Sequence, residues 1–331
     1  MSDLVGAVLT RPSIEPDAAA RLLGGHWGID GVLRSLPSER DRNFAVVLDG
    51  DDRYVLKISN GNEDPSFLDL QHRAMERLAA AGVPCQLPVA SRDGREVVDL
   101  GSPDAPMLVR LLTWLPGRPL ATIPPVDRPD ELLADLGRVM GRTAAALVGF
   151  DHPAAHRTFQ WSAEQDLDVV AAHASAVTDP ERAALLAAWQ RRLGPLADRF
   201  ADLRHGVIHN DANDHNVLVD DDGRSISGLL DLGDAVWSVL VNELAVAAAY
   251  AALGAADPLA VVATVRAGFE EALPLTDAES AVLLDLVALR LATSVSLSAH
   301  QSRLAPDDPY LTVSEAPAWR LLERLAALPP R

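Results

Sequence analysis

The most polar loop of the chain carries side chains whose types and spacing suit phosphoryl transfer. It runs from His209 to Asn216 with the sequence His-Asn-Asp-Ala-Asn-Asp-His-Asn. Asp211 follows the apolar pair Val207 and Ile208, so its carboxylate can be held rigidly, accept a hydrogen bond from a substrate hydroxyl and aim that hydroxyl at a γ-phosphorus. Five residues after Asp211, the amide oxygen of Asn216 can face the same cavity and ligate Mg²⁺. We therefore predict Asp211 as the catalytic residue and Asn216 as a metal ligand.

Two residues outside this loop fit the same chemistry. Asp231 lies fifteen residues after Asn216, at the end of a predicted strand, where a carboxylate can bridge Mg²⁺ to the β- and γ-phosphates. Lys57 is the sole lysine beside 28 arginines. A compact ammonium cannot be exchanged freely for a planar guanidinium, so we expect Lys57 to hold the α- and β-phosphates.

These residues also have an ordinary structural interpretation. An acidic surface loop with a capping Asn and a turn Asp would show the same residue types, and one lysine has to lie somewhere. The joint occurrence of Asp211, Asn216, Asp231 and Lys57 at separated positions favours phosphoryl transfer over this alternative.

Three neighbouring histidines raise the question of a metal site of another kind. His205, His209 and His215 lack the spacing on one element, and the carboxylate base, that a His-based zinc site needs. A calcium loop starting at Asp211 fails because Asn216 occupies the position that requires glycine. We predict that His209 braces the loop backbone through its ring nitrogens.

Composition limits the classes of protein that fit. The 331 residues are 48% hydrophobic, enough for two lobes with apolar cores. A net charge of −18 repels phosphate backbones, so we expect no nucleic-acid partner. The single cysteine, Cys85, excludes an internal disulfide and suits a reducing compartment. No apolar run reaches the length of a membrane span, and the first residues lack a secretory signal, which predicts a cytoplasmic protein without a membrane partner.

The first third of the chain is β-rich. An acidic turn at 49–52 separates the apolar runs Phe44–Leu48 and Tyr54–Ile58, which predicts a hairpin carrying Lys57. A helix is expected over Pro65–Ala81, and a further strand over Met107–Leu112.

Beyond about residue 125 the chain becomes Ala- and Leu-rich with helical periodicity. A β-like island at 206–231 interrupts it and contains the polar loop, two strands and Asp231. These patterns predict an α+β fold with a β-rich first lobe and a mainly helical second lobe. The helices are expected over Glu131–Val148, Pro180–Phe200, Asn242–Leu253, Asp257–Leu273 and Asp277–Leu297.

The polar loop together with its flanking segments resembles the aminoglycoside-phosphotransferase and choline-kinase-like superfamily of protein-kinase-fold enzymes. The catalytic loop His209–Asn216 and the segment Leu230–Asp234 carry this resemblance. A narrower resemblance to the hydroxylysine kinases rests on the flanking segments, so that the similar segments span nearly the whole chain. The flanking segments are Leu36–Phe44, Tyr54–Lys57, Val109–Gly117, Ala267–Glu270 and Tyr310–Val313.

The resemblance implies a bilobal protein-kinase-like fold, with a nucleotide-binding lobe over 1–113 and a catalytic and substrate-binding lobe over 114–331. It implies Mg²⁺, a nucleoside triphosphate (GTP or ATP) and a small-molecule acceptor, 5-hydroxylysine or a related amino alcohol or hydroxy amino acid. The nucleotide base would lie against the segment that contains Arg110 and Leu112, largely on its backbone.

Two departures from the family pattern concern the nucleotide. The turn from Pro37 to Asn43 has no glycine, so Ser38 and backbone amides would cover the phosphates. Gln71 stands where many relatives place the Glu that pairs with the lysine. It can hydrogen-bond Lys57 but gives no full counter-charge, and Asp69 and Glu76 are the carboxylates nearby.

On the substrate side, an amine needs carboxylates beyond the catalytic one, and Asp214 and Asp234 flank Asp211. Both have loop-capping or arginine-pairing roles as alternatives. Arg290 lies in an apolar helical run, where an unpaired charge is costly. It either meets a carboxylate from another segment or binds a substrate carboxylate.

Several functions stay open on the sequence. The same chemistry could act on homoserine, choline or an aminoglycoside. A pseudokinase that binds nucleotide without transferring phosphate is opposed by the intact Asp211, Asn216 and Asp231. A zinc hydrolase built on the histidines would need no nucleotide.

Overall fold

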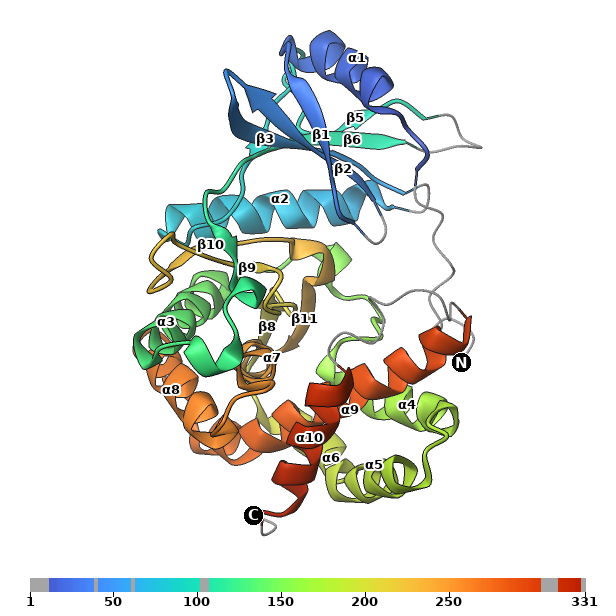
Figure 1. Ribbon diagram of the computed structural model, residues 1–331, viewed down its shortest axis with the longest axis vertical. Helices are drawn as coiled ribbons and strands as arrows, with labels where there is room; N and C mark the ends of the chain where they lie inside the picture. The colour runs from blue at the N-terminus through green and yellow to red at the C-terminus, as the bar shows by residue number, and fades with distance from the viewer. Residues whose placement is uncertain (1–11, 39–40, 61–62, 102–106, 305–314, 329–331) are drawn as a thin grey trace. The chain divides into compact units, whose positions relative to one another are not determined.

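The structure, a computed structural model, describes residues 12–38, 41–60, 63–101, 107–304 and 315–328 (Figure 1). The chain forms two compact units, Ser2–Pro116 and Gly117–Arg331. The division falls after Pro116, three residues beyond the predicted position. The predicted fold class is confirmed, because the first unit is built on an antiparallel sheet and the second is mainly helical.

An antiparallel sheet forms the centre of the N-terminal unit. Its strands follow the order β1-β2-β3-β6-β4, with β5 beside β6. The predicted hairpin is confirmed, since β2 and β3 pair antiparallel and Asn43 lies opposite Lys57. The strands are β1 (Val32–Leu36), β2 (Arg42–Leu48), β3 (Asp51–Ile58), β4 (Pro88–Val89), β5 (Val98–Asp99) and β6 (Leu108–Thr113).

The two faces of this sheet carry different residues because successive side chains of a strand alternate. Helix α1 (Pro16–Trp27), which the sequence patterns did not predict, packs on one face against the apolar side chains of β2, β3 and β6. The opposite face contains Lys57 and Arg110, which lie opposite each other in the β3–β6 pair. Helix α2 (Pro65–Ala80) covers that second face (Figure 1).

The C-terminal unit is built on helices, most of them close to the predicted ranges. The predicted helix Pro180–Phe200 is interrupted, because Pro195 removes a backbone donor and ends the regular hydrogen bonding. Helix α4 was not predicted. The helices are α3 (Asp130–Leu147), α4 (Ala163–His173), α5 (Pro180–Leu193), α6 (Leu196–Arg199), α7 (Val241–Ala252), α8 (Pro258–Glu270), α9 (Asp277–Leu304) and α10 (Glu315–Ala326).

Helix α9 is the one helix among the described residues that is long and apolar enough to cross a membrane by composition alone. Within its most apolar window, 72% of the helix is buried inside the unit. This burial is what the core helix of a globular unit shows, and a cytoplasmic location stays a prediction.

Two small sheets position the polar loop. β8 (His205–Ile208) pairs with β11 (Val236–Val239), and β9 (Val217–Val219) pairs with β10 (Ile226–Leu229) and β7 (Arg118–Pro119). The predicted strands on both sides of the loop are confirmed, but they belong to different sheets. The loop therefore crosses from one sheet to the other, and each of its ends is anchored separately.

Close packing of α3 and α8 depends on three glycines. A Cβ atom added to Gly137 would lie 2.0 Å from the carbonyl oxygen of Val265, and one on Gly268 would lie 2.1 Å from that of Ala134. Gly141 meets the backbone of Phe269 in the same way. The two helix backbones approach too closely for any side chain at these points.

We expect Gly137→Ala to lower the free energy of unfolding by about 1–3 kcal/mol, because the helices must separate to admit the methyl group. Gly25→Ala in α1 is the matched control, since its added Cβ meets nothing within 4 Å, and it should stabilise by about 0.5–1 kcal/mol. Chemical denaturation of both variants measures the difference. A Gly137→Ala protein as stable as the wild type would contradict the packing.

Candidate active site

A left-handed residue turns the chain at the end of β8 and presents Asp211. Asn210 has φ 67° and is fully buried. Its Nδ2 donates to the carbonyl oxygens of Trp161 at 3.0 Å and Asp234 at 3.4 Å, and its Oδ1 accepts from Asn242 Nδ2 at 3.0 Å. Asn tolerates this backbone region better than most residues, and here its side chain is fully used as well. Asn210 therefore fixes the direction in which the chain leaves the strand.

The Asp211 carboxylate is held by three side chains. Asn213 Nδ2 donates to both carboxylate oxygens at 3.0 Å, and Asn216 Nδ2 donates to Oδ2 at 2.7 Å. Arg290 Nη2 donates to Oδ1 at 3.3 Å. About 20% of the Asp211 side chain remains exposed, so the group is fixed in orientation and still accessible. A catalytic base needs both properties.

The pKa of Asp211 is raised to about 8, mainly by loss of solvent and then by the neighbouring carboxylate of Asp234. The guanidinium of Arg290 and the hydrogen bond from Asn213 lower this pKa, and Asp231 contributes a smaller increase. The carboxylates of Asp231 and Asp234 and the guanidinium of Arg290 therefore all lie near enough to Asp211 to affect its pKa. A cation that binds among them would favour the ionised form of Asp211.

Asn216 and Asp231 present oxygen atoms at adjacent positions. The Leu230 N–H donates to the Asn216 carbonyl oxygen at 2.8 Å, which ties the start of β9 to the end of β10. Since the Asn216 amide nitrogen is used by Asp211, its amide oxygen is left for another partner. Asp231 is exposed, with φ 57°, and its Oδ1 accepts from the Gly233 N–H at 2.9 Å. An amide oxygen beside a carboxylate fits the oxygen ligands that Mg²⁺ prefers.

His209 has both ring nitrogens engaged with backbone. Nε2 lies 2.8 Å from the Leu230 carbonyl oxygen, and Nδ1 accepts from the Asp211 N–H at 3.2 Å. This is the geometry expected of a loop brace and leaves neither nitrogen for a metal. Across the described ranges, no group of three or more His, Cys, Asp or Glu side chains is arranged to hold a metal ion.

Glu243 of α7 holds the backbone at the same point. Its Oε2 accepts from the His209 N–H at 2.6 Å, and burial raises its pKa to about 7, while hydrogen bonds from the backbone N–H groups of His209 and Asn210 lower it. The sequence analysis did not predict this role for Glu243 or the role of Asn210. The available signals were an Asn directly before Asp211, and a Glu in an apolar helix shortly after Asp231.

The predicted substrate residues have different surroundings. Asp214 pairs with the buried Arg128 at 3.1 Å, which favours its arginine-pairing alternative over substrate contact. Asp234 lies near enough to Asp211 to raise its pKa, so it remains beside the catalytic carboxylate. Arg290 meets a carboxylate from another segment, as one of its two alternatives expected, and that carboxylate is Asp211.

The residues predicted to bind nucleotide lie in the N-terminal unit. Lys57 and Arg110 are buried on the same face of the sheet, and Leu112 is buried on β6. Arg110 Nη2 donates to Gln71 Oε1 at 2.7 Å, a contact that the sequence did not predict. Ser38 Oγ accepts from the Asp41 N–H at 3.2 Å in the turn after β1.

The carboxylates near Gln71 are engaged elsewhere. Asp69 and Glu76 both pair with Arg73, at 3.3 Å and 2.5 Å. Glu39 and Arg40 of the predicted phosphate turn lie outside the described residues. The roles of Lys57, Ser38, Arg110 and Leu112 toward a nucleotide therefore stay predictions.

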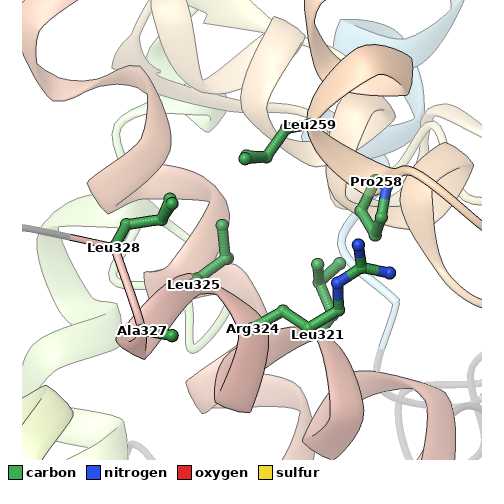
Figure 2. A pocket seen from close by; sticks show the side chains of 7 residues that line it. All are labelled: Pro258, Leu259, Leu321, Arg324, Leu325, Ala327 and Leu328. Atoms are coloured by element: carbon green, nitrogen blue, oxygen red, sulfur yellow. The ribbon is translucent and has the colours of Figure 1, made fainter.

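An apolar pocket of about 260 Å³ lies between α8 and α10 (Figure 2). Figure 2 shows Leu259 of α8 facing Leu325 and Leu328. None of the predicted site residues lines this pocket, so it is separate from the site around Asp211.

The Glu243 carboxyl gives a pH-dependent prediction for stability. Its pKa of about 7 in the folded chain exceeds its ordinary value near 4.5, so between these values the folded state holds a proton that the unfolded chain has released. The free energy of unfolding should therefore fall as pH rises through this window, by an amount on the order of 1–3 kcal/mol.

Glu243→Gln resembles the protonated carboxyl and should remove this contribution. Urea unfolding of the wild type and the variant between pH 4.5 and 8 measures it, with the exposed Glu131→Gln as control. Parallel pH profiles for wild type and Glu243→Gln would show that the group is not perturbed.

Comparison with known proteins places the chain in a family. Residues 32–280 match the phosphotransferase enzyme family. The hydroxylysine kinase of Xenopus laevis is 30% identical over 95% of this chain and 90% of its own length. The homoserine kinase of Methylobacillus flagellatus is 30% identical over 68% of this chain and 64% of its own length.

Solved structures agree on the fold. A microcompartment-associated aminopropanol kinase superposes with a TM-score of 0.69 at 19% identity, covering 93% of this chain and 97% of its own. An amicoumacin kinase in complex with AMP-PNP and Ca²⁺ has a TM-score of 0.67 at 16% identity, covering 88% of each chain. The predicted family and enzyme class are thereby confirmed: the chain belongs to the phosphotransferase enzyme family and is a small-molecule kinase that transfers phosphate from a nucleotide to a hydroxyl group.

Proposed function

We propose that this kinase phosphorylates the side-chain hydroxyl of a hydroxylated amino acid, 5-hydroxylysine or a close analogue, with GTP or ATP as donor. The observation that carries the proposal is the fixed, partly exposed Asp211 carboxylate, with the oxygens of Asn216 and Asp231 on the adjoining strand ends. Phosphoryl transfer depends mainly on positioning and charge neutralisation, which these groups supply.

The proposed acceptor class rests on the relatives of the chain. The hydroxylysine kinases match it over nearly their whole length, and the homoserine kinases over about two thirds. Hydroxylysine and homoserine are both amino acids with a hydroxylated side chain. The acidic residues around Asp211 favour an acceptor that carries a positive charge, as such amino acids do.

In the reaction, Asp211 accepts the hydrogen bond of the acceptor hydroxyl and takes its proton as the new O–P bond forms. The bond between the γ-phosphorus and the bridging oxygen breaks, and the nucleoside diphosphate leaves. Asn216 Oδ1 and the Asp231 carboxylate would hold Mg²⁺, which neutralises phosphate charge when bound. Lys57 of the N-terminal unit is proposed to hold the α- and β-phosphates.

Acceptor-dependent release of nucleoside diphosphate tests this function. The protein is incubated with Mg²⁺, ATP or GTP, and each of 5-hydroxylysine, homoserine, choline and kanamycin. We expect the highest kcat/KM with 5-hydroxylysine or another hydroxy amino acid. Turnover confined to choline or kanamycin would contradict the acceptor, and tight nucleotide binding without turnover on any acceptor would indicate a pseudokinase.

Asp211→Asn should lower kcat by about 10²–10⁴-fold, because the amide cannot accept the proton. Nucleotide binding, measured by calorimetry, should change little. Asp168→Asn, at an exposed position of α4, is the control and should retain full activity. A kcat for Asp211→Asn near that of the wild type would remove Asp211 from the reaction.

Asp231→Asn should raise the Mg²⁺ concentration needed for half-maximal activity by about tenfold or more, since a neutral amide replaces a proposed carboxylate ligand. Titration of nucleotide binding against Mg²⁺ gives a second readout that does not depend on turnover. The control is Asp222→Asn, in the exposed turn after β9. An unchanged Mg²⁺ dependence in both assays would contradict the ligand assignment.

A further inference from the structure

The contacts that hold Asp211 come from two different parts of the chain. Asn213 and Asn216 belong to the same loop as Asp211 and move with it. Arg290 belongs to α9, 79 residues away, and among the described hydrogen bonds it alone ties the Asp211 side chain to the helical core. The orientation of the carboxylate relative to the rest of the unit therefore depends on Arg290.

Arg290 is itself immobilised. Its side chain is 2% exposed, its Nη1 lies 3.4 Å from the Trp161 carbonyl oxygen, and its guanidinium carbon lies 4.4 Å from the Trp161 ring centre and 5.8 Å from that of Tyr250. Such aromatic neighbours fix the plane of a guanidinium and stabilise its charge. Arg290 is thus a rigid donor that cannot follow the loop if the loop shifts.

A second carboxyl faces Arg290 from α4. Asp166 is 1% exposed and close enough to Arg290 that the guanidinium lowers its pKa, although burial, the larger effect, raises that pKa to about 7. Thr293, on α9, also interacts with the Asp166 side chain and lowers its pKa. Arg290 and Thr293 lie one turn apart on α9, so both side chains face the same α4–α9 contact.

A carboxyl at this depth costs stability when it is ionised, and an apolar replacement of similar volume is often more stable. Residues that cost stability in this way are commonly retained for function. Asp166 is placed for such a role, because its carboxylate, when ionised, adds a second negative charge near Arg290 besides that of Asp211.

We propose that Arg290 and Asp166 are positioning residues for phosphoryl transfer: Arg290 fixes the Asp211 carboxylate to the helical core, and Asp166 supplies the counter-charge for Arg290. This inference rests on the proposed role of Asp211 as the base. It differs from the alternative that Arg290 binds a carboxylate of the acceptor, which would act on acceptor affinity.

The kinetic signature separates a positioning role from the other possibilities. Arg290→Met should lower kcat about 10–100-fold, while the KM values for nucleotide and acceptor stay within about twofold. Arg290→Lys should recover part of the loss, because it restores a charged donor. Asp166→Asn should lower kcat about 3–10-fold and yet unfold at a higher urea concentration than the wild type at pH 8.

The matched control is Arg204→Met. Arg204 pairs with Glu279 at 2.7 Å near the start of the same helix α9, so this variant removes an ion pair of α9 away from Asp211. It should lose stability and keep the wild-type kcat. A wild-type kcat in Arg290→Met overturns the proposal, as does a rise in acceptor KM with kcat unchanged.

Two further measurements cover the remaining outcomes. If Arg290→Met does not fold, the kcat values of Arg290→Lys and Asp166→Asn decide, and wild-type values for both overturn the proposal. If Asp211→Asn retains activity, the proposed function fails by itself. Crystal structures of wild type and Arg290→Met then decide the positioning role: a turned Asp211 carboxylate in the variant supports it, and an unchanged one overturns it.

Discussion

The site depends on keeping several carboxylates close together without letting them move apart. Asp234 and Asp231 raise the cost of ionising Asp211, because like charges at short range in a partly buried place repel strongly. A flexible loop would relieve this repulsion by separating them. The structure prevents that through backbone contacts at both ends of the loop: His209 binds the Leu230 carbonyl, and Leu230 in turn binds Asn216. Because the carboxylates are held close together, they create a negative potential that attracts cations.

Helix α7 also helps to hold the Asp211 loop in place. The N-terminal part of α7 supplies Glu243 and Asn242, which hold the backbone and side chain of the two residues before Asp211. Asn210 and Asp231, two of the three described non-glycine residues with positive φ, lie on either side of this arrangement. Strained backbone of this kind persists only where the surroundings over-determine it. Here those surroundings are a buried helix and two separately anchored sheets.

Much of this could be predicted from the sequence, for identifiable reasons. The positions of Asp211, Asn216 and Asp231 next to strand ends could be predicted because they depend on local spacing alone. The hairpin around Lys57 could be predicted because its turn is local. The contacts that come from distant segments left no such pattern: Asn210 to Trp161, Asp214 to Arg128, and Asp211 to Arg290 join residues 49 to 86 positions apart. Helix α4 was not predicted either. The proposed role of Asp166, which lies on α4, could not be predicted because its partner Arg290 lies on α9. The contact of Gln71 with Arg110 likewise left no pattern in the sequence, since Arg110 lies on a strand 39 residues away.

The use of arginine and lysine in this chain follows from the same physics. An arginine that faces a carboxylate at the active site must hold one geometry and keep its charge, and Arg290 meets both needs through its planar group and two aromatic neighbours. Lys57, by contrast, lies opposite Arg110 on a buried face of the sheet in the N-terminal unit. Gln71 accepts a hydrogen bond from Arg110 there without adding negative charge. The guanidinium of Arg290 and the ammonium of Lys57 thus have different surroundings: Arg290 lies beside two aromatic rings and a carboxylate, whereas Lys57 lies across the sheet from another cation.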